Sequence, residues 1–292
     1  MMASEWFIVT LMLLITLGTL MTRRSHSVSR DFYLRVRSWW WMILLLTVVT
    51  FSGENARQVL LLFIGWVSVY EISVVSKLKR RVQGAGHAVV LMLVFIEHYF
   101  ANPIVLTVAA IGISLIVFFY GFRRPCDIAS QRAFNIFIAL LIMITACLSL
   151  RYYRDPDTVF GLMLYLIFVT QSCDVCQYFC GKAFGKRKLA PNLSPNKTLE
   201  GAVGGALIAA LLATGVSQLI TPLPLLSALW LSLVLVSLGI AGDLYVSWFK
   251  RRSGVKDMGR LIPGHGGMMD RVDSLLFSAP MLAVIAAYLI PV

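Results

Sequence analysis

Residues 224–252 read PLLSALWLSLVLVSLGIAGDLYVSWFKRR, an apolar run that contains one acidic residue and ends in three bases. The apolar part, residues 224–247, is long enough for the roughly 20 residues that a helix needs to cross a bilayer. The bases stand where such a helix would leave the hydrocarbon. The stretch therefore predicts a membrane-spanning helix that carries a carboxylate, Asp243, about one turn inside its basic end.

The same pattern recurs along the whole chain of 292 residues. Hydrophobic residues make up 59% of it and charged residues 14%, against roughly a quarter charged in soluble domains. This composition excludes a water-soluble globule and predicts an all-α, polytopic integral membrane protein of nine to ten helices. Segments 39–52 and 87–100 are short for a span and could be re-entrant. The ten apolar segments without Lys or Arg are 5–21, 39–52, 58–76, 87–100, 104–121, 133–150, 158–180, 200–220, 224–247 and 274–292.

The basic residues predict the orientation. If the amino terminus lies outside and all ten segments cross, the five inner loops carry 5, 4, 3, 5 and 6 Lys or Arg residues. Only Arg57, Arg151 and Arg154 fall on the outer side, as the positive-inside rule requires. The net charge of +12 is then explained by lipid headgroups, and nucleic acid is not predicted as a partner.

The chain is predicted to form one membrane domain with two dissimilar parts. Residues 1–157 have short basic inner loops, whereas residues 158–292 have two longer inner loops rich in Gly, Pro, Ser, Asn, Lys and Asp. Long loops between packed helices usually carry function. A transporter also fits ten helices with intramembrane acids, but it predicts acids spread through the membrane depth, whereas the polar loops here lie at one face.

Acidic residues occur where the membrane should exclude them. Each carboxylate at mid-helix costs roughly 2.5–3.5 kcal/mol on insertion scales, so a partner, a cation or protonation must offset it. The predicted spans contain no Lys or Arg, which makes a metal ion a candidate partner. Glu97 with His98 is interpreted as an outer-interface pair. The six acids inside or at the ends of predicted spans are Glu5, Glu71, Glu97, Asp174, Glu200 and Asp243.

The last inner loop, residues 248–273, combines acids, bases and glycines. Asp270 and Asp273 are three residues apart and would share one helical face, an arrangement that a hard divalent cation accepts. Lys250, Arg251, Lys256 and Arg271 could donate to phosphate oxygens. Acids and bases together suggest metal plus polyphosphate. The alternative is that the bases only set topology, while the two aspartates cap the final helix or pair with Arg271.

Glycines and one histidine complete this loop. Gly264, Gly266 and Gly267 would let the backbone approach an anion. His265 stands between the basic run and the carboxylates. It could contact phosphate or transfer a proton, or it could simply hydrogen-bond the loop.

The other rich loop, residues 181–199, is not a Walker loop, because the required Gly and Ser or Thr positions are not filled. Ser194 and Thr198 could cap the helix that follows, and Gly201 with Gly205 is a helix-packing pattern of membrane proteins. Capping and packing leave Lys197 unexplained.

Taken together, these motifs resemble the phosphatidate cytidylyltransferase family, the CDP-diacylglycerol synthases. The resemblance covers residues 170–280, and the amino-terminal half supports it only by hydropathy. The carboxy-terminal signature is met by Gly242, Asp243, Leu244, Ser247, Lys250, Arg251, Lys256, Asp257, His265, Gly266, Gly267, Asp270, Arg271 and Asp273. The upstream stretch is met by Asp174, Tyr178, Gly181, Phe184, Gly185, Leu189, Pro191, Ser194, Pro195, Lys197, Thr198, Glu200 and Gly201.

The resemblance implies transfer of a cytidylyl group from CTP to phosphatidic acid at the cytosolic face of a bacterial inner membrane. It implies Mg²⁺, with room for a second cation such as K⁺, and leaves a homodimer open. The implied metal ligands are Asp243, Asp270 and Asp273. The same aspartates with Lys197, Lys256 and His265 form the implied catalytic set, and Ser194, Lys250, Arg251, Arg271, Asp174 and Ser247 the implied substrate-binding set.

Two positions depart from the family pattern. Val246 stands where the family usually has Glu, and Asn196 stands where it usually has the first of two lysines. The loss of one acid and one base keeps two alternatives open: a cytidylyltransferase for a different lipid phosphate, and a membrane paralogue without catalysis.

Overall fold

The computed structural model describes residues 53–100, 112, 128–150, 156–259, 261 and 266–289. The predicted spans 5–21 and 39–52, and 104–121 apart from residue 112, lie outside these residues. The described helices are α3 (Glu54–Val75), α4 (Arg80–Phe100), α6 (Ile128–Ser149), α7 (Pro156–Phe184), α8 (Leu199–Ile220), α9 (Leu225–Arg252), α10 (Met269–Val272) and α11 (Leu275–Leu289).

Six of these helices, α3, α4, α6, α7, α8 and α9, are long and apolar enough to cross a membrane. Each coincides with a predicted span, and α11 occupies most of the last one. The chain is therefore a mostly helical membrane protein, as predicted from composition. A total of ten spans stays a prediction.

Helix α4 shows why one predicted span looked too short. Segment 87–100 was predicted with 14 residues because residues 77–86 were assigned to an inner loop, but the helix has 21 residues and begins at Arg80. Arg80 and Arg81 form its first turn, where long basic side chains reach polar surroundings while the backbone stays helical. The helix is therefore long enough to cross a membrane, unlike the predicted 14-residue segment.

A β-hairpin corrects the all-α prediction. Strands β1 (Lys188–Ala190) and β2 (Ser194–Thr198) pair antiparallel, with Lys188 opposite Thr198 and Ala190 opposite Ser194. The connecting residues include Pro191 and Asn192, which favour turns. The sequence pattern was obscured because the strands are short and largely polar.

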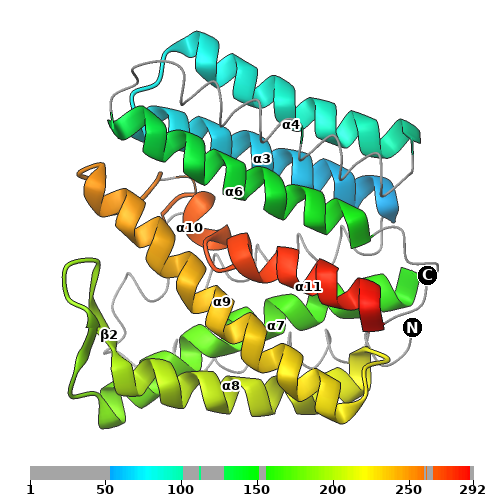
Figure 1. Ribbon diagram of the computed structural model, residues 1–292, viewed down its shortest axis with the longest axis vertical. Helices are drawn as coiled ribbons and strands as arrows, with labels where there is room; N and C mark the ends of the chain where they lie inside the picture. The colour runs from blue at the N-terminus through cyan, green and yellow to red at the C-terminus, as the bar shows by residue number, and fades with distance from the viewer. Residues whose placement is uncertain are drawn as a thin grey trace, which may run out of the picture.

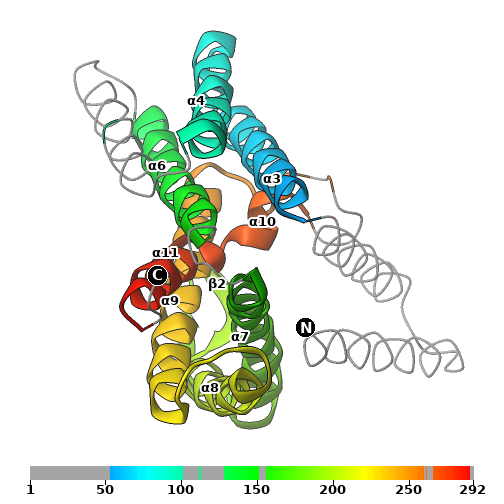
Figure 2. The ribbon, with the colours of Figure 1, turned by 90° about the vertical axis from the view of Figure 1, so that its right-hand side faces the viewer.

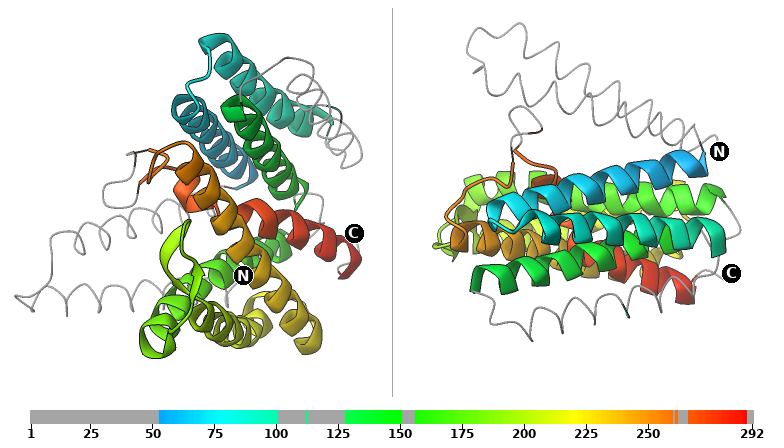
Figure 3. Two further views of the ribbon diagram at one scale, coloured as in Figure 1. Left: turned by 60° about the vertical axis from the view of Figure 1, so that its left-hand side comes forward. Right: turned by 90° about the horizontal axis from the view of Figure 1, so that it is seen from above.

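The helices form two groups (Figures 1 and 2). Helices α3, α4 and α6 pack together, and α7, α8 and α9 form the second group. Helix α11 lies between the groups and packs against both α6 and α9. The hairpin, α10 and the carboxyl end of α9 lie toward the same end of the helices, and Figure 3 shows the helices running alongside one another.

Small residues let α7 and α8 approach closely. A Cβ atom on Gly201 would lie 2.8 Å from the Cα atom of Gly181, and one on Gly205 would overlap the backbone of Gln177. This confirms the predicted packing role of Gly201 and Gly205. On the other face of α7, the buried Tyr165 hydroxyl donates to the carbonyl of Ala228 on α9 at 2.9 Å. These contacts fix the helices that carry the candidate site.

Candidate functional site

A tight turn at the end of α9 brings the next loop back over the helix. Gly254 has a φ of 74°, and its N–H donates to the carbonyl of Arg251 at 3.2 Å. The N–H of Val255 donates to the carbonyl of Lys250 at 3.0 Å. This pair of bonds is a Schellman ending, which requires a left-handed residue that glycine supplies without strain. Residues 256–259 therefore return toward α10.

Asp270 is the centre of the first ion pair. Its side chain is 5% exposed, and its Oδ1 accepts a hydrogen bond from the Lys250 Nζ at 2.8 Å. Its Oδ2 accepts from the backbone N–H groups of Met258 and Gly267, both at 2.9 Å. The carboxylate thus joins α9, the returning loop and α10. These contacts replace the alternatives of capping and Arg271 pairing as the main role of Asp270.

Lys197 and Asp243 form the second ion pair. The Lys197 Nζ donates to the Asp243 Oδ2. Lys197 lies on β2 directly before α8, and the Thr198 hydroxyl caps that helix by accepting from the N–H of Gly201 at 3.2 Å. The cap prediction is therefore confirmed for Thr198, whereas Ser194 belongs to the hairpin. The cap fixes the point from which Lys197 reaches α9.

Two further carboxylates act on Lys197. Burial alone would lower the pKa of its ammonium, but the charge of Asp243, its hydrogen bond, and the charges of Asp174 and Asp273 outweigh burial and raise that pKa. Lys197 is therefore held protonated. One ammonium from the hairpin thus pairs with a carboxylate of α9 and lies near carboxylates of α7 and of the residue that follows α10.

Asp273 lies beside these carboxylates. Its Oδ1 accepts from the N–H of Ser274 at 2.8 Å. Burial raises the pKa of Asp273 well above its usual range, and the nearby charges of Asp243 and Asp174 raise it further, whereas Lys250 opposes the rise. Asp270 and Asp273 therefore have different hydrogen-bond partners, although the charge of Lys250 acts on both. A cation at this position would favour the charged form of Asp273.

The site holds more acid than base. Asp174, Asp243, Asp270 and Asp273 stand against Lys197, Lys250 and Arg271. These hard oxygen donors fit Mg²⁺ in chemistry. In the described part of the chain, however, no three His, Cys, Asp or Glu side chains are already grouped as a metal-binding set.

Arg271 has a buried, unused donor. Its Nε has no hydrogen-bond partner among the described residues, and its charge acts on Asp174. An unpaired guanidinium N–H beside an acidic cluster is suited to a phosphate oxygen. This feature fits the predicted role of Arg271 in binding substrate.

The remaining predicted site residues are spread around this centre. Ser247 is buried on α9, one turn after Asp243. Arg251 donates from its Nε to the carbonyl of Leu193 at 3.1 Å, so it holds the hairpin against α9. Lys256 is exposed on the returning loop. His265 lies outside the described residues.

Glu71 is the residue whose role the sequence analysis missed. It was recognised as an intramembrane acid, but no partner was assigned. In the structure its carboxylate accepts hydrogen bonds from the N–H groups of Met268 and Met269, directly before Asp270. The sequence signal for a role of Glu71 was its occurrence as an acid in an apolar segment. None of the motifs that resemble the family lies in α3.

The two departures from the family pattern lie in contrasting surroundings. Asn196 is exposed on β2 while its neighbour Lys197 faces the site, as the alternation of a strand requires. Val246 is 0% exposed and packs in the hydrophobic core. Asn196 therefore removes a base from the surface, whereas Val246 replaces an acid with core packing.

We expect Val246→Glu to destabilise the protein, by at least about 2 kcal/mol, because it would bury a carboxyl group among apolar side chains. The measurement is the thermal unfolding temperature in detergent, with Val203→Glu as the control, since Val203 is an exposed residue of α8. A carboxyl group at position 203 would lie outside the hydrophobic core of the bundle. An unchanged unfolding temperature for Val246→Glu would show that a partner for the acid exists at this position.

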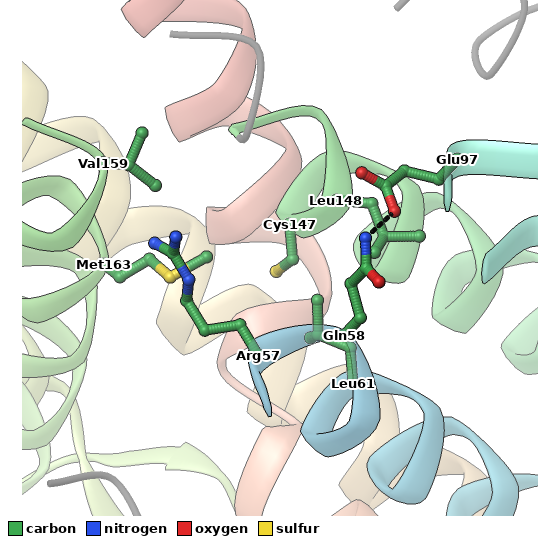
Figure 4. A pocket seen from close by; sticks show the side chains of 8 residues that line it. All are labelled: Arg57, Gln58, Leu61, Glu97, Cys147, Leu148, Val159 and Met163. Carbon is green, nitrogen blue, oxygen red and sulfur yellow. Dashed lines mark hydrogen bonds between the residues drawn. The ribbon is translucent and has the colours of Figure 1, made fainter. Parts of the chain in front are cut away.

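The opposite end of α3 and α4 carries a different polar group (Figure 4). Glu97 is 0% exposed and accepts from the side-chain amide of Gln58, whose carbonyl oxygen lies 3.2 Å from the Nδ1 of His98. Gln58 and Glu97 border a small pocket that Arg57 and Cys147 also line. Glu97 is thus buried, and Gln58 links it to His98 at this end of the helices. The location of this group at the outer interface stays a prediction.

Comparison with known proteins identifies the family. The sequence model of the cytidylyltransferase family matches residues 33–289. The chain is 41% identical over 155 residues to phosphatidate cytidylyltransferase of Haemophilus influenzae, covering 50% of this chain and 54% of that protein. It is 47% identical over 127 residues to phosphatidate cytidylyltransferase of Bacillus subtilis, covering 43% and 47%.

A further relative is YnbB of Escherichia coli K12, named as an uncharacterized protein, which is 45% identical over 127 residues, covering 44% of this chain and 43% of that one. The chain thus spans about half the length of the relatives it matches. The family model covers far more than half of the present sequence. The chain belongs to the cytidylyltransferase family.

Proposed function

We propose that this protein transfers a cytidylyl group from CTP to phosphatidate, which yields CDP-diacylglycerol and pyrophosphate. The observation that carries the proposal is the pair of neighbouring ion pairs, Lys197 with Asp243 and Lys250 with Asp270, at one end of an apolar helical bundle. Relatives named phosphatidate cytidylyltransferase support the choice of substrates. A headgroup phosphate and a soluble nucleotide can both reach such a position.

The reaction joins two anions. An oxygen of the lipid phosphate attacks the α-phosphorus of CTP, a new P–O bond forms, and the bond to the bridging oxygen of the β-phosphate breaks. Pyrophosphate leaves with the electron pair. Such a displacement depends on positioning and charge neutralisation more than on covalent help from the protein.

The basic residues divide this task by position. Arg271 offers a buried donor beside Asp174, and exposed Lys256 stands on the returning loop. Lys197 and Lys250 are already held by carboxylates, so their ammonium groups are oriented before substrate arrives. We assign all four to phosphate binding, with Ser194, Ser247 and Arg251 supporting the hairpin and α9. His265 stays a prediction for phosphate contact or proton transfer.

We assign Mg²⁺ to Asp243, Asp270 and Asp273, whose oxygens suit a hard cation. The bound ion would neutralise phosphate charge and so lower repulsion between the two substrates. We also propose K⁺ as a second cation and a homodimeric assembly.

The test is a panel of lipid phosphates. The purified protein is reconstituted in vesicles with Mg²⁺ and labelled CTP, and phosphatidate is compared with other lipid phosphates. We expect labelled lipid with phosphatidate in the vesicle. Label with another lipid phosphate alone would identify the alternative cytidylyltransferase, and nucleotide binding without labelled lipid would identify a paralogue without catalysis.

We infer that the ion pairs face the cytosol of a bacterial inner membrane. The basic loop at residues 181–199 and the basic end of α9 support this orientation through the positive-inside rule. In this proposal, the predicted segments 5–21, 39–52 and 104–121 also cross the membrane, which gives ten spans. Residues 1–157 and 158–292 form its two parts within one membrane domain.

Cysteine labelling tests the orientation. In a chain without native cysteines, Lys186→Cys on the hairpin side should resist an impermeant maleimide in intact cells and react after permeabilisation. Asn55→Cys, at the other end of α3, should react in intact cells. Both positions are exposed. The reverse pattern would contradict the proposed orientation.

A further inference from the structure

Glu71 connects the amino-terminal helices to the site. It lies on α3 and is 4% exposed. Its Oε1 accepts from the N–H of Met268 at 2.8 Å, and its Oε2 accepts from the N–H of Met269 at 2.9 Å. Almost 200 residues separate these partners along the sequence. Both oxygens of a buried carboxylate are therefore used to hold backbone that directly precedes Asp270.

Two glycines make room for this carboxylate. A Cβ atom on Gly259 would lie 2.5 Å from the Glu71 Oε1, and one on Gly267 would lie 2.5 and 2.6 Å from its two oxygens. Neither position could hold a larger residue without moving Glu71. Gly267 was predicted to let the backbone approach an anion, and the anion in the structure is the carboxylate of Glu71.

Glu71 and Asp270 hold adjacent parts of the same backbone. The N–H of Gly267 donates to Asp270, and the next two N–H groups, of Met268 and Met269, donate to Glu71. Asp270 also accepts from Met258 on the returning loop. Since the Oδ2 of Asp270 is fixed by this backbone, its Oδ1 is directed at Lys250.

We propose that Glu71 is a positioning residue for Asp270. It touches no reacting atom in this assignment; it sets the backbone from which Asp270 meets Lys250. The proposal rests on the proposed function, because its kinetic consequence requires that Asp270 acts in cytidylyl transfer. The contact itself is independent of that function.

A comparison with Glu97 separates positioning from burial alone. Both acids lie in the amino-terminal helix group and are nearly or fully buried. Glu97 accepts from the side chain of Gln58 at the far end of α3, whereas Glu71 holds the loop of the site. Glu97→Gln is therefore the matched control for Glu71→Gln.

The experiment compares Glu71→Gln, Glu97→Gln and wild type in vesicles. The amide of Glu71→Gln would place an NH₂ group against a backbone N–H donor, so the loop must shift. We expect kcat per folded molecule to fall about 10-fold or more and the Mg²⁺ concentration for half-maximal activity to rise severalfold. Glu97→Gln should lower thermal stability without changing either kinetic quantity.

A second pair of variants approaches the same contact from the loop. Gly267→Ala should reproduce the kinetic change, because its methyl group would displace Glu71. Gly84→Ala on α4 is its control, since a Cβ atom there would meet nothing within 4 Å. Combining Glu71→Gln with Gly267→Ala should cost little more than either alone, because both remove one contact.

Hydrogen exchange of residues 266–273 provides a readout without turnover. We expect faster exchange in Glu71→Gln than in wild type or Glu97→Gln. If the wild-type protein shows no turnover, the proposed function is rejected, but hydrogen exchange still tests whether Glu71 holds this backbone. Faster exchange with unchanged kcat and Mg²⁺ dependence would reduce Glu71 to a structural residue, and unchanged exchange would overturn the inference altogether.

Discussion

Asp270→Asn is expected to reduce cytidylyl transfer at least about 100-fold. The substitution removes the charge that pairs with Lys250 and places an NH₂ group beside either that ammonium or the two backbone N–H donors. The proposed cation site loses a ligand at the same time. The measurement is labelled lipid formed per folded molecule from CTP and phosphatidate.

The control for this variant is Glu97→Gln, which also converts a buried carboxylate to an amide but at the far end of α3 and α4. It should retain turnover within about threefold of wild type after correction for folded protein. Asp270→Asn with comparable turnover would remove Asp270 from the mechanism.

The second large effect is expected for Lys197→Met. Methionine keeps most of the side-chain length but leaves Asp174, Asp243 and Asp273 without the ammonium that acts on all three. We expect turnover to fall at least about 100-fold and the unfolding temperature to drop, because partly buried carboxylates lose their counterion. Lys188→Met, at an exposed position of β1, should change neither quantity.

Adding Asp243→Asn to Lys197→Met distinguishes the two consequences. Removal of both partners relieves the uncompensated charge, so part of the thermal stability should return. Turnover should stay low, because the proposed phosphate donor and a proposed metal ligand are both absent. Recovery of turnover together with stability would show that this ion pair only supports the fold.

The spans could be predicted because each apolar run must satisfy its backbone within the membrane. The predicted segment 200–220 and the observed α8, Leu199–Ile220, agree almost residue for residue. The prediction for α4 was too short, since residues 80–86 belong to the helix although they were assigned to an inner loop. The hairpin was missed because its two short strands lack a hydrophobic alternation.

The site could be predicted as a set of residues but not as a set of contacts. Sequence spacing brought Asp270 and Asp273 together on one face, whereas the structure gives them different hydrogen-bond partners. The pairing of Lys197 with Asp243 joins residues on a strand and a distant helix, so no local period could reveal it. Glu71 lies farther still from its partners, and only the packing of α3 against α10 assigns it a role.

The central claim is that the acid and base cluster transfers the cytidylyl group of CTP, which contains the α-phosphorus, to a lipid phosphate. Parallel reactions with CTP labelled at the α- or the γ-phosphorus test it most directly, using purified wild-type protein in phosphatidate vesicles with Mg²⁺. The account predicts that α-label enters the lipid and γ-label is released as pyrophosphate. Label from the γ-phosphorus in lipid, or no labelled lipid from either CTP, would contradict it.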